Sequence, residues 1–192
     1  MQKPMKQKYN SRRQYRTSIQ GKILHPYDCW SGIFDRCYDS VNKNPAYYDC
    51  EVHDDWLDYQ DFCDWYYAQE YIESGWHIDK DILVKGNKIY SAEFCRFVPR
   101  EINNLFTLRR RDRGDTPVGV CFHPRLNRYE ARTSDGDGKL LYLGLYSSAE
   151  EAFLVSKEAK ETRIKLIADK YKGRIDPEIY KALINWQITM ED

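Results

Sequence analysis

Residues 119–153 constrain the fold more than any other part of this chain. They predict three short strands followed by a helix that begins near Ser148. The strands cover residues 119–122, 128–133 and 140–146. Asp135-Gly136 lies between the second and third strands, and Asp-Gly is a strong signal for a tight hairpin. A small sheet with one apolar face needs a helix to cover it, so this stretch predicts an antiparallel sheet packed on a long helix over residues 148–171.

The second predicted strand separates an apolar side from a charged side. Its apolar set is Tyr129, Ala131 and Thr133, and its charged set is Arg128, Glu130 and Arg132. Successive side chains of a strand face opposite sides of the sheet, so the helix covers the apolar set and the arginines stay exposed. An arginine presents a planar fork of donors that suits guanine edges and phosphates. The exposed face predicts a nucleic-acid reader, and arginines that only keep the sheet soluble are the alternative.

The chain has no net charge, but its basic and acidic residues are concentrated in separate segments. The chain has 192 residues, with 30 Lys and Arg against 30 Asp and Glu. Counted along the sequence, the net charge is +7 over residues 1–26, −11 over 27–82, +6 over 83–132 and −2 over the remainder. Such blocks predict separate surfaces with separate partners, and simple solvated faces are the alternative.

The organisation along the chain follows these blocks. Residues 1–24 predict a flexible basic arm whose Arg12, Arg13 and Arg16 follow a phosphate backbone, or else a plain disordered terminus. Apolar residues at helical spacing predict helices over residues 27–39 and about 54–73, with the aromatic stripe of the second serving as core. The predicted divisions are an arm over 1–24, a domain over 25–109, an exposed basic linker over 110–117 and a domain over 118–192.

The sequence shows neither a membrane span nor a signal peptide, and this indicates the cellular compartment. No apolar run reaches the length of a membrane span, and the N-terminus shows no signal peptide, so we expect a cytoplasmic protein without a membrane partner. The six cysteines should then be thiols or metal ligands. Three of the cysteines and one histidine could form a tetrahedral Cys₃His zinc site, made of Cys37, Cys50, His53 and Cys95. Buried thiols that act as small hydrophobic side chains are the alternative.

The C-terminal motifs carry a resemblance. They are Gly119-Val120, Tyr129-x-Ala131, Tyr142-Leu143-Gly144 and Ser148-Ala149-Glu150-Glu151-Ala152. This set resembles the Apetala-type DNA-binding domain of plant ethylene-response factors, which also occurs in phage homing endonucleases. The resemblance implies a three-stranded sheet laid in the major groove of double-stranded DNA. The DNA-binding residues that it and the basic arm indicate are Arg125, Arg128, Arg132, Lys139, Tyr142, Arg12, Arg13 and Arg16.

The family pattern is incomplete. Tyr142 stands where the family has tryptophan, and Val118, Cys121 and Leu140 stand where the plant domains have arginine. The resemblance therefore implies a groove reader without implying a base preference.

The middle of the chain resembles divergent HNH-type proteins of phages. The motifs are Cys50-x-x-His53-x-x-Trp56, Phe62-x-x-Trp65, Asp79-Lys80-Asp81 and Gly86-Asn87-Lys88. The resemblance implies a histidine base acting on water beside one divalent metal. Lys80 takes a position where active members commonly have histidine, and a protonated lysine cannot accept a proton. A strand over residues 78–84 would still place His77, Asp79 and Asp81 on one face to hold Mg²⁺, and an exposed charged strand edge is the alternative.

Together these observations predict an α+β fold, with a small helical and ββα HNH-like domain before the three-stranded sheet on its long helix. The leading hypothesis is a sequence-specific double-stranded DNA-binding protein of phage or mobile-element origin, in a bacterial host. It would derive from a homing endonuclease and act by occupancy, as a repressor or blocker. One alternative is an active Mg²⁺-dependent homing or nicking endonuclease. Another is a protein-binding inhibitor that uses the acidic aromatic face of residues 27–73, which would otherwise serve as a homodimer contact.

Overall fold

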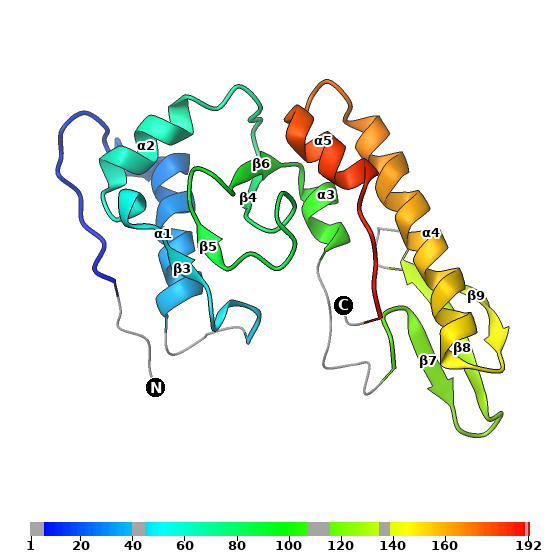
Figure 1. Cartoon of the computed structure of the whole chain (residues 1–192). Coiled ribbons are helices and arrows are strands. Elements are labelled where there is room, and N and C mark those ends of the chain that lie inside the picture. The colour runs from blue at the N-terminus through cyan, green and yellow to red at the C-terminus, as the bar shows by residue number, and fades with distance from the viewer. Residues whose placement is uncertain (1–5, 40–44, 107–115, 135–138, 191) are drawn as a thin grey trace. The chain divides into compact units, whose positions relative to one another are not determined.

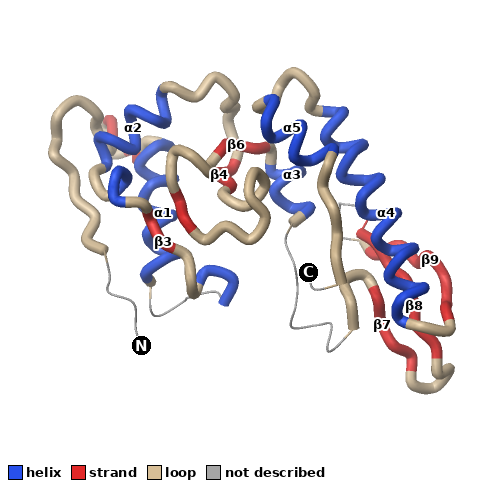
Figure 2. The backbone as a smooth tube through the Cα atoms, viewed as in Figure 1, coloured by secondary structure: helices blue, strands red, loops and turns tan. Residues whose placement is uncertain are grey.

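The computed structural model describes residues 6–39, 45–106, 116–134, 139–190 and 192. These residues form a mixed α+β fold, as the sequence predicts, divided into two compact units over residues 1–97 and 98–192 (Figures 1 and 2). The sequence placed the boundary at the linker 110–117, most of which lies outside the described residues. The structure instead divides the chain between Phe97 and Val98.

Unit 1 is built from short elements. Its helices are α1 (His25–Tyr38) and α2 (Tyr59–Tyr67), with 3-10 turns η1 (Pro45–Tyr47) and η2 (Asp54–Trp56). Its strands are β1 (Ser18–Ile19), β2 (Lys22–Ile23), β3 (Glu51–Val52), β4 (His77–Asp79), β5 (Ile89–Tyr90) and β6 (Arg96–Val98). They pair two by two, as β1 with β2, β3 with β5 and β4 with β6, and the β3–β5 pair is parallel.

Aromatic side chains form the core of unit 1. In α1 the predicted apolar positions, Trp30, Ile33, Phe34 and Cys37, are all buried. The helix predicted over 54–73 is divided into η2 and α2, because the Asp58 carboxylate accepts a hydrogen bond from Gln60 N at 3.0 Å and caps a new helix.

The stripe of this second helix packs as expected. Phe62 is fully buried and its ring lies 5.0 Å from Trp56 and 5.5 Å from Trp65, centroid to centroid. Trp30 joins the cluster by donating its indole N–H to Trp56 O at 2.7 Å, which satisfies a buried polar group.

Unit 2 contains the three-stranded sheet. Its strands are β7 (Val120–His123), β8 (Arg128–Ser134) and β9 (Leu140–Tyr146), antiparallel in the order β7-β8-β9. Its helices are α3 (Arg100–Leu105), α4 (Ala149–Lys170) and α5 (Pro177–Ile184). Figure 1 shows α4 running along the sheet. The predicted strands and long helix are therefore confirmed to within a residue or two at each end.

Local hydrogen bonds explain where α4 begins. Ser148 accepts from Glu151 N at 3.2 Å, and the Glu151 carboxylate accepts from Ser147 N at 3.1 Å. Each bond satisfies an N–H that the first turn or its entry would leave unpaired. Carboxylates in this turn also complement the positive end of the helix dipole.

Close packing joins the sheet to α4. Gly119, just before β7, has φ +78° and lies so near α4 that a Cβ there would stand 2.7 Å from the Ser156 Cβ. The Ser156 hydroxyl donates to Gly119 O at 2.8 Å. Ala131 and Ala152 are fully buried in the same interface, so small side chains allow the helix and the sheet to approach closely.

Side chains also fasten α3 into unit 2, which explains the earlier boundary. The Glu101 carboxylate of α3 accepts from Lys170 Nζ at 2.5 Å and from the Tyr171 hydroxyl at 2.9 Å, both at the end of α4. Phe106, the residue after α3, packs on Trp186 with ring centroids 4.4 Å apart. No local motif of the sequence indicates these contacts.

Candidate nucleic-acid interface

The strand register sorts the sheet into a helix side and an outward side. Val120 pairs with Ala131, and Ala131 pairs with Gly144. Directly paired residues share a face, so these three lie on the side of α4. The residues that the register places on the opposite, outward side are Cys121, His123, Arg128, Glu130, Arg132, Ser134, Leu140, Tyr142 and Leu145. The alternation predicted for β8 therefore agrees with the register.

A β-bulge in β9 adds Tyr142 to this outward side. Ala131 pairs with Gly144 and Arg132 pairs with Tyr142, so Leu143 is left without a register partner. A bulge changes the alternation after the extra residue. Tyr142 consequently lies beside Arg132, and 62% of its surface is exposed.

Glu130 lies at the centre of the outward side and is 9% exposed. Its carboxylate forms an ion pair with Arg132 Nε and lies 2.5 Å from His123 Nε2. The hydrogen bond from Arg132 is the main reason that the pKa of Glu130 falls below its ordinary value, and the contact with His123 acts in the same direction. The carboxylate thus fixes the orientation of the Arg132 guanidinium through Nε, a contact that does not involve its two terminal nitrogens.

The remaining predicted contact residues of unit 2 lie at the rim of the sheet. Arg128 is exposed and donates to Ser147 Oγ at 2.6 Å, which holds its guanidinium along the edge. Arg125 is exposed in the turn between β7 and β8, and Lys139 is exposed at the start of β9. The structure therefore brings Arg125, Arg128, Arg132, Lys139 and Tyr142 into one small unit around the same sheet.

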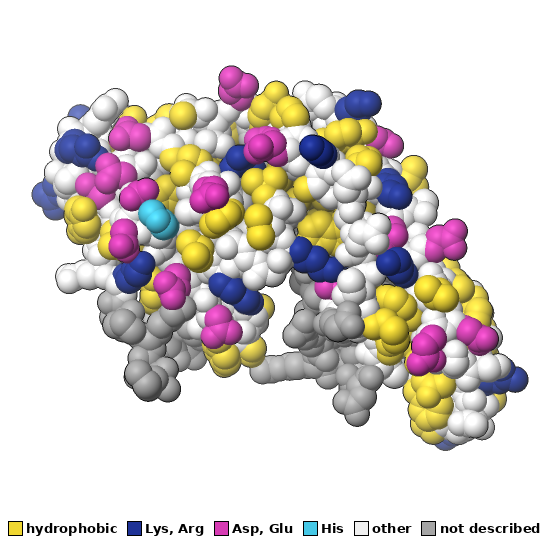
Figure 3. Space-filling model, in the orientation of Figure 1, with side chains coloured by type: hydrophobic (Ala, Val, Ile, Leu, Met, Phe, Trp, Pro, Cys, Tyr) yellow, Lys and Arg dark blue, Asp and Glu magenta, His cyan; other side chains and the backbone are white. Residues whose placement is uncertain are grey.

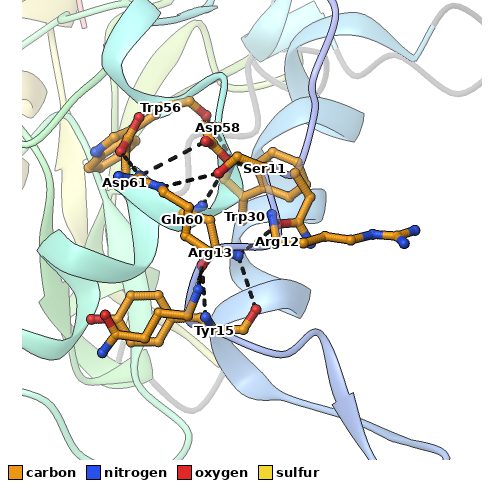
Figure 4. A network of polar contacts seen from close by, with 11 residues as sticks. Ser11, Arg12, Arg13, Tyr15, Trp30, Trp56, Asp58, Gln60 and Asp61 are labelled. Atoms are coloured by element: carbon orange, nitrogen blue, oxygen red, sulfur yellow. Dashed lines mark hydrogen bonds and ion pairs between the residues drawn. The ribbon is translucent and has the colours of Figure 1, made fainter.

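The three arginines of the predicted arm lie in unit 1, and Figure 4 shows two of them, Arg12 and Arg13. The sequence predicted a flexible arm, but from Lys6 onward the chain is held against α1, η2 and α2. Arg13 forms an ion pair with Asp61, and Arg16 O accepts from the Tyr59 hydroxyl at 2.9 Å. Arg12 is exposed and its side chain points away from these acids. The arm departs from the prediction because side chains of α2, far away in sequence, bind its backbone.

The predicted catalytic set is not gathered on a strand. The strand expected over 78–84 ends at Asp79, because the Asp79 carboxylate accepts from the backbone N–H groups of Asp81 and Ile82, each at 2.8 Å. That turn removes Asp81 from the alternation that would have aligned it with His77 and Asp79. Burial raises the pKa of Asp79 above its ordinary value, even though the two N–H groups act in the opposite direction.

Lys80 has a structural position in the same turn. Its side chain is buried, donates to Asn87 O at 2.8 Å and forms an ion pair with Asp81. The Asn87 side chain returns a hydrogen bond to Lys80 O at 2.8 Å. Lys80 thus fastens the loop that leads into β5.

The predicted zinc ligands differ in their surroundings. Cys37, Cys50 and Cys95 are buried, and burial raises the pKa of the Cys50 and Cys95 thiols, which favours the neutral form. His53 is exposed, and its Nδ1 accepts from Asp55 N at 3.3 Å at the start of η2. Within the described residues, no three His, Cys, Asp or Glu side chains are grouped to hold a metal ion. In those residues, neither the predicted zinc set nor His77, Asp79 and Asp81 forms such a group.

Sequence reasoning missed two features that matter here. The first is the pairing of Glu130 with His123, which follows from the β7–β8 register and not from any motif. The second is the role of Asp58 and Gln60 in binding the N-terminal segment. The alternating charges of β8 could have indicated that Glu130 has a charged or polar partner on the same side of the sheet. A glutamine inside a helical pattern does not indicate that it binds a distant segment.

In the described part of the chain, no helix is both long and apolar enough to cross a membrane. Comparisons with protein-family models, curated proteins and solved structures find no match for this chain. Function must therefore be argued from the side chains themselves.

Proposed function

We propose that this chain is a sequence-specific double-stranded DNA-binding protein that reads the major groove with the outward side of β7, β8 and β9. The observation that carries the proposal is the arrangement of Arg128, Arg132 and Tyr142 on the side of the sheet opposite α4. A major groove admits a β-ribbon, and arginine is its commonest reader of guanine. The resemblance to the Apetala-type domain supports the same docking.

The side chains divide into two roles in this proposal. Arg132 reads base edges, because Glu130 engages its Nε and the terminal nitrogens extend beyond that contact. Tyr142, exposed beside it, packs against bases or the sugar-phosphate backbone. Arg125, Arg128 and Lys139 at the rim contact phosphates, which set position and affinity without reading sequence.

We further propose that the protein acts by occupancy, as a repressor or blocker, and not by cleavage. The support is the buried position of Lys80, which serves the loop before β5, together with the turn after Asp79, which takes Asp81 off the strand face of His77 and Asp79. The resemblance of the middle region to phage HNH proteins supports an origin in a homing endonuclease of a phage or mobile element.

The test of DNA reading is selection of bound duplexes from a random pool by the purified full chain. We expect enrichment of one motif. Arg132→Ala should cost about 1–3 kcal/mol of discrimination at one base pair, whereas Arg128→Ala should weaken all sequences alike and reduce the salt slope by about one. Lys165→Ala, an exposed residue of α4, removes the same charge and is the matched control. If the double variant Arg128→Ala, Arg132→Ala binds like the wild type, the sheet is not the reader.

The nuclease alternative needs a separate experiment. Supercoiled plasmid that carries the selected motif is incubated with the protein and Mg²⁺ or Mn²⁺. We expect no nicked or linear product. Cleavage that depends on the metal and is lost in His77→Ala would replace the occupancy proposal with the enzyme.

A further inference from the structure

The N-terminal segment over residues 6–16, which we call the strap, contacts unit 1 without joining its core. Each of its residues is exposed or half-buried, and the first buried side chain in the described chain is Pro26 of α1. The strap is held mainly by polar contacts, and Tyr15 also stacks on Tyr67 with ring centroids 5.1 Å apart. Many of the polar contacts converge on four side chains, which we call the strap site: Asp54, Asp58, Gln60 and Asp61.

Gln60 is the centre of the strap site and is 1% exposed. Its Oε1 accepts from the backbone N–H groups of Gln14 and Tyr15 at 2.8 and 2.7 Å. Its Nε2 donates to Asn10 Oδ1 at 2.7 Å and to Tyr15 O at 3.0 Å. The strap therefore uses the full hydrogen-bonding capacity of this buried amide. Figure 4 shows Gln60 facing Tyr15.

Main-chain contacts extend the recognition toward the start of the strap. Tyr9 N donates to Leu57 O at 2.9 Å, and Tyr59 N donates to Tyr9 O at 3.0 Å. Ser11 N donates to Asp58 Oδ1 at 3.1 Å. Contacts of this kind give affinity for an extended backbone, as when a peptide adds to the edge of a sheet.

Charge gives the strap site its selectivity. Lys6 Nζ lies 2.7 Å from the Asp54 carboxylate, and its hydrogen bond lowers the pKa of Asp54. Arg13 pairs with Asp61. Figure 3 shows basic side chains among the acidic ones over unit 1, so the predicted acidic face is partly neutralised on the side shown. The strap site fits an extended peptide with basic residues seven positions apart.

We propose that the strap site is a peptide-binding site that accepts the strap of a second copy of this chain, so that two copies pair by exchanging straps. The ligand that fits the site is carried by the chain itself. Its connection to α1 is the β1–β2 hairpin, whose four strand residues are all exposed. Because neither strap nor hairpin contributes to the core, exchange leaves each core intact, and such exchange is a low-cost route to a dimer. The proposal is independent of DNA binding.

Two full-length variants test the exchange by complementation. The first has a defective site, Gln60→Ala with Asp61→Asn, and keeps its strap. The second has a defective strap, Tyr9→Pro with Gln14→Pro, which removes the N–H donors to Leu57 O and Gln60 Oε1. Circular dichroism of each variant checks that the helices remain, because Gln60→Ala removes a buried side chain.

Equimolar mixing should give a one-to-one complex with twice the mass of one chain in size-exclusion chromatography with light scattering. Each variant alone should keep the mass of one chain. Adding Arg12→Ala to the site-defective chain should leave the complex unchanged, because that side chain points away from the strap site. Adding Arg13→Ala should weaken it about two- to fivefold, the effect of losing an exposed ion pair. A mixture that stays at the mass of one chain would overturn the proposal.

Hydrogen exchange on the wild-type chain provides a second test that needs no complex. The amides of Gln14 and Tyr15 should be protected, and Gln60→Ala should remove that protection while α1 stays protected. If these two amides exchange as fast as unstructured ones in the wild type, the strap does not occupy the site and the inference fails.

Discussion

The two units use their charged and polar side chains for opposite purposes. In unit 1 such groups connect segments that are far apart in sequence, as Gln60 does with Gln14 and Tyr15, and as Lys80 does with Asn87. In unit 2 a regular sheet and the long helix α4 hold the backbone, and charged groups gather on the outward side of the sheet. Strands of two or three residues form few backbone hydrogen bonds with each other. In unit 1, polar side chains therefore supply the connections between segments.

This difference separates charges that serve the fold from charges that are left for a partner. Most of the acidic side chains of unit 1 discussed above are engaged in capping, in a turn or with the strap. On the sheet of unit 2, Glu130 engages Arg132 and leaves its terminal nitrogens beyond the contact. A charge pattern in the sequence therefore has a different meaning in each unit.

The largest expected effect is a loss of stability in unit 1 that leaves unit 2 unchanged. Phe62→Ala empties a fully buried site among Trp56 and Trp65 and should destabilise unit 1 by about 3–5 kcal/mol. Hydrogen exchange measured by mass spectrometry should show faster opening of unit 1 with unit 2 unchanged. Tyr48→Ala, an exposed aromatic residue of the same unit, is the control. Equal loss of protection in both units would mean that they unfold together.

A glycine tests the close packing of unit 2. Gly119→Ala adds a Cβ 2.7 Å from Ser156 Cβ and 2.8 Å from Arg132 O, at a φ of +78°. We expect a loss of about 2–4 kcal/mol from unfavourable φ and overpacking together. Gly173→Ala is the matched control, since its φ is +79° and the space around it is open, so it should cost only the conformational part, about 1–2 kcal/mol. Chemical denaturation followed by circular dichroism measures both, and equal losses would refute the close approach.

Lowering the pH should reduce the stability that Glu130 contributes on the outward side of the sheet. Its pKa is lowered in the folded state, so its contribution to stability is complete above the unfolded value near 4.5 and disappears as the pH falls through the folded value. Glu130→Gln should cost about 1–3 kcal/mol at pH 7 and less at pH 3. Denaturation midpoints at the two pH values measure the difference, with the exposed Glu158→Gln as control. A loss that is the same at both pH values would contradict the ion pair with Arg132.

The smallest effect concerns the strap. Arg13→Ala removes an exposed ion pair with Asp61 and should lower the melting temperature of unit 1 only slightly at low salt. The difference from the wild type should vanish near 1 M salt, where the screening length is about 3 Å. Thermal unfolding at two salt concentrations measures it. A large effect that persists in salt would show that the strap supports the core directly.

Much of unit 2 was predictable because its signals are local. The Asp-Gly hairpin, the alternation around Ala131 and the cap at Ser148 each act within a few residues, and β8, β9 and α4 follow them closely. The outward position of Arg128 and Arg132 followed from alternation alone. The contact of Glu130 with His123 did not, because it depends on how β7 aligns with β8.

Unit 1 was less predictable because its determinants are long-range. The parallel pair of β3 and β5 joins segments on either side of α2 and β4. Asp79 reads as a strand residue, yet its carboxylate ends the strand by accepting two backbone N–H groups. The ordering of the strap rests on Gln60, whose partners lie more than forty positions away.

The bulge in β9 has a consequence for how this sheet tolerates change over time. Tyr142 and Leu145 lie on the same side of the sheet although an odd number of positions separates them, and the unpaired Leu143 makes this arrangement work. If Leu143 instead paired with Arg132 in a regular ladder, Leu140 and Tyr142 would turn toward α4 and Leu141 would turn outward. The strand should therefore tolerate loss of Leu143 itself, whereas a deletion between Leu140 and Tyr142 would change which side the residues before it face.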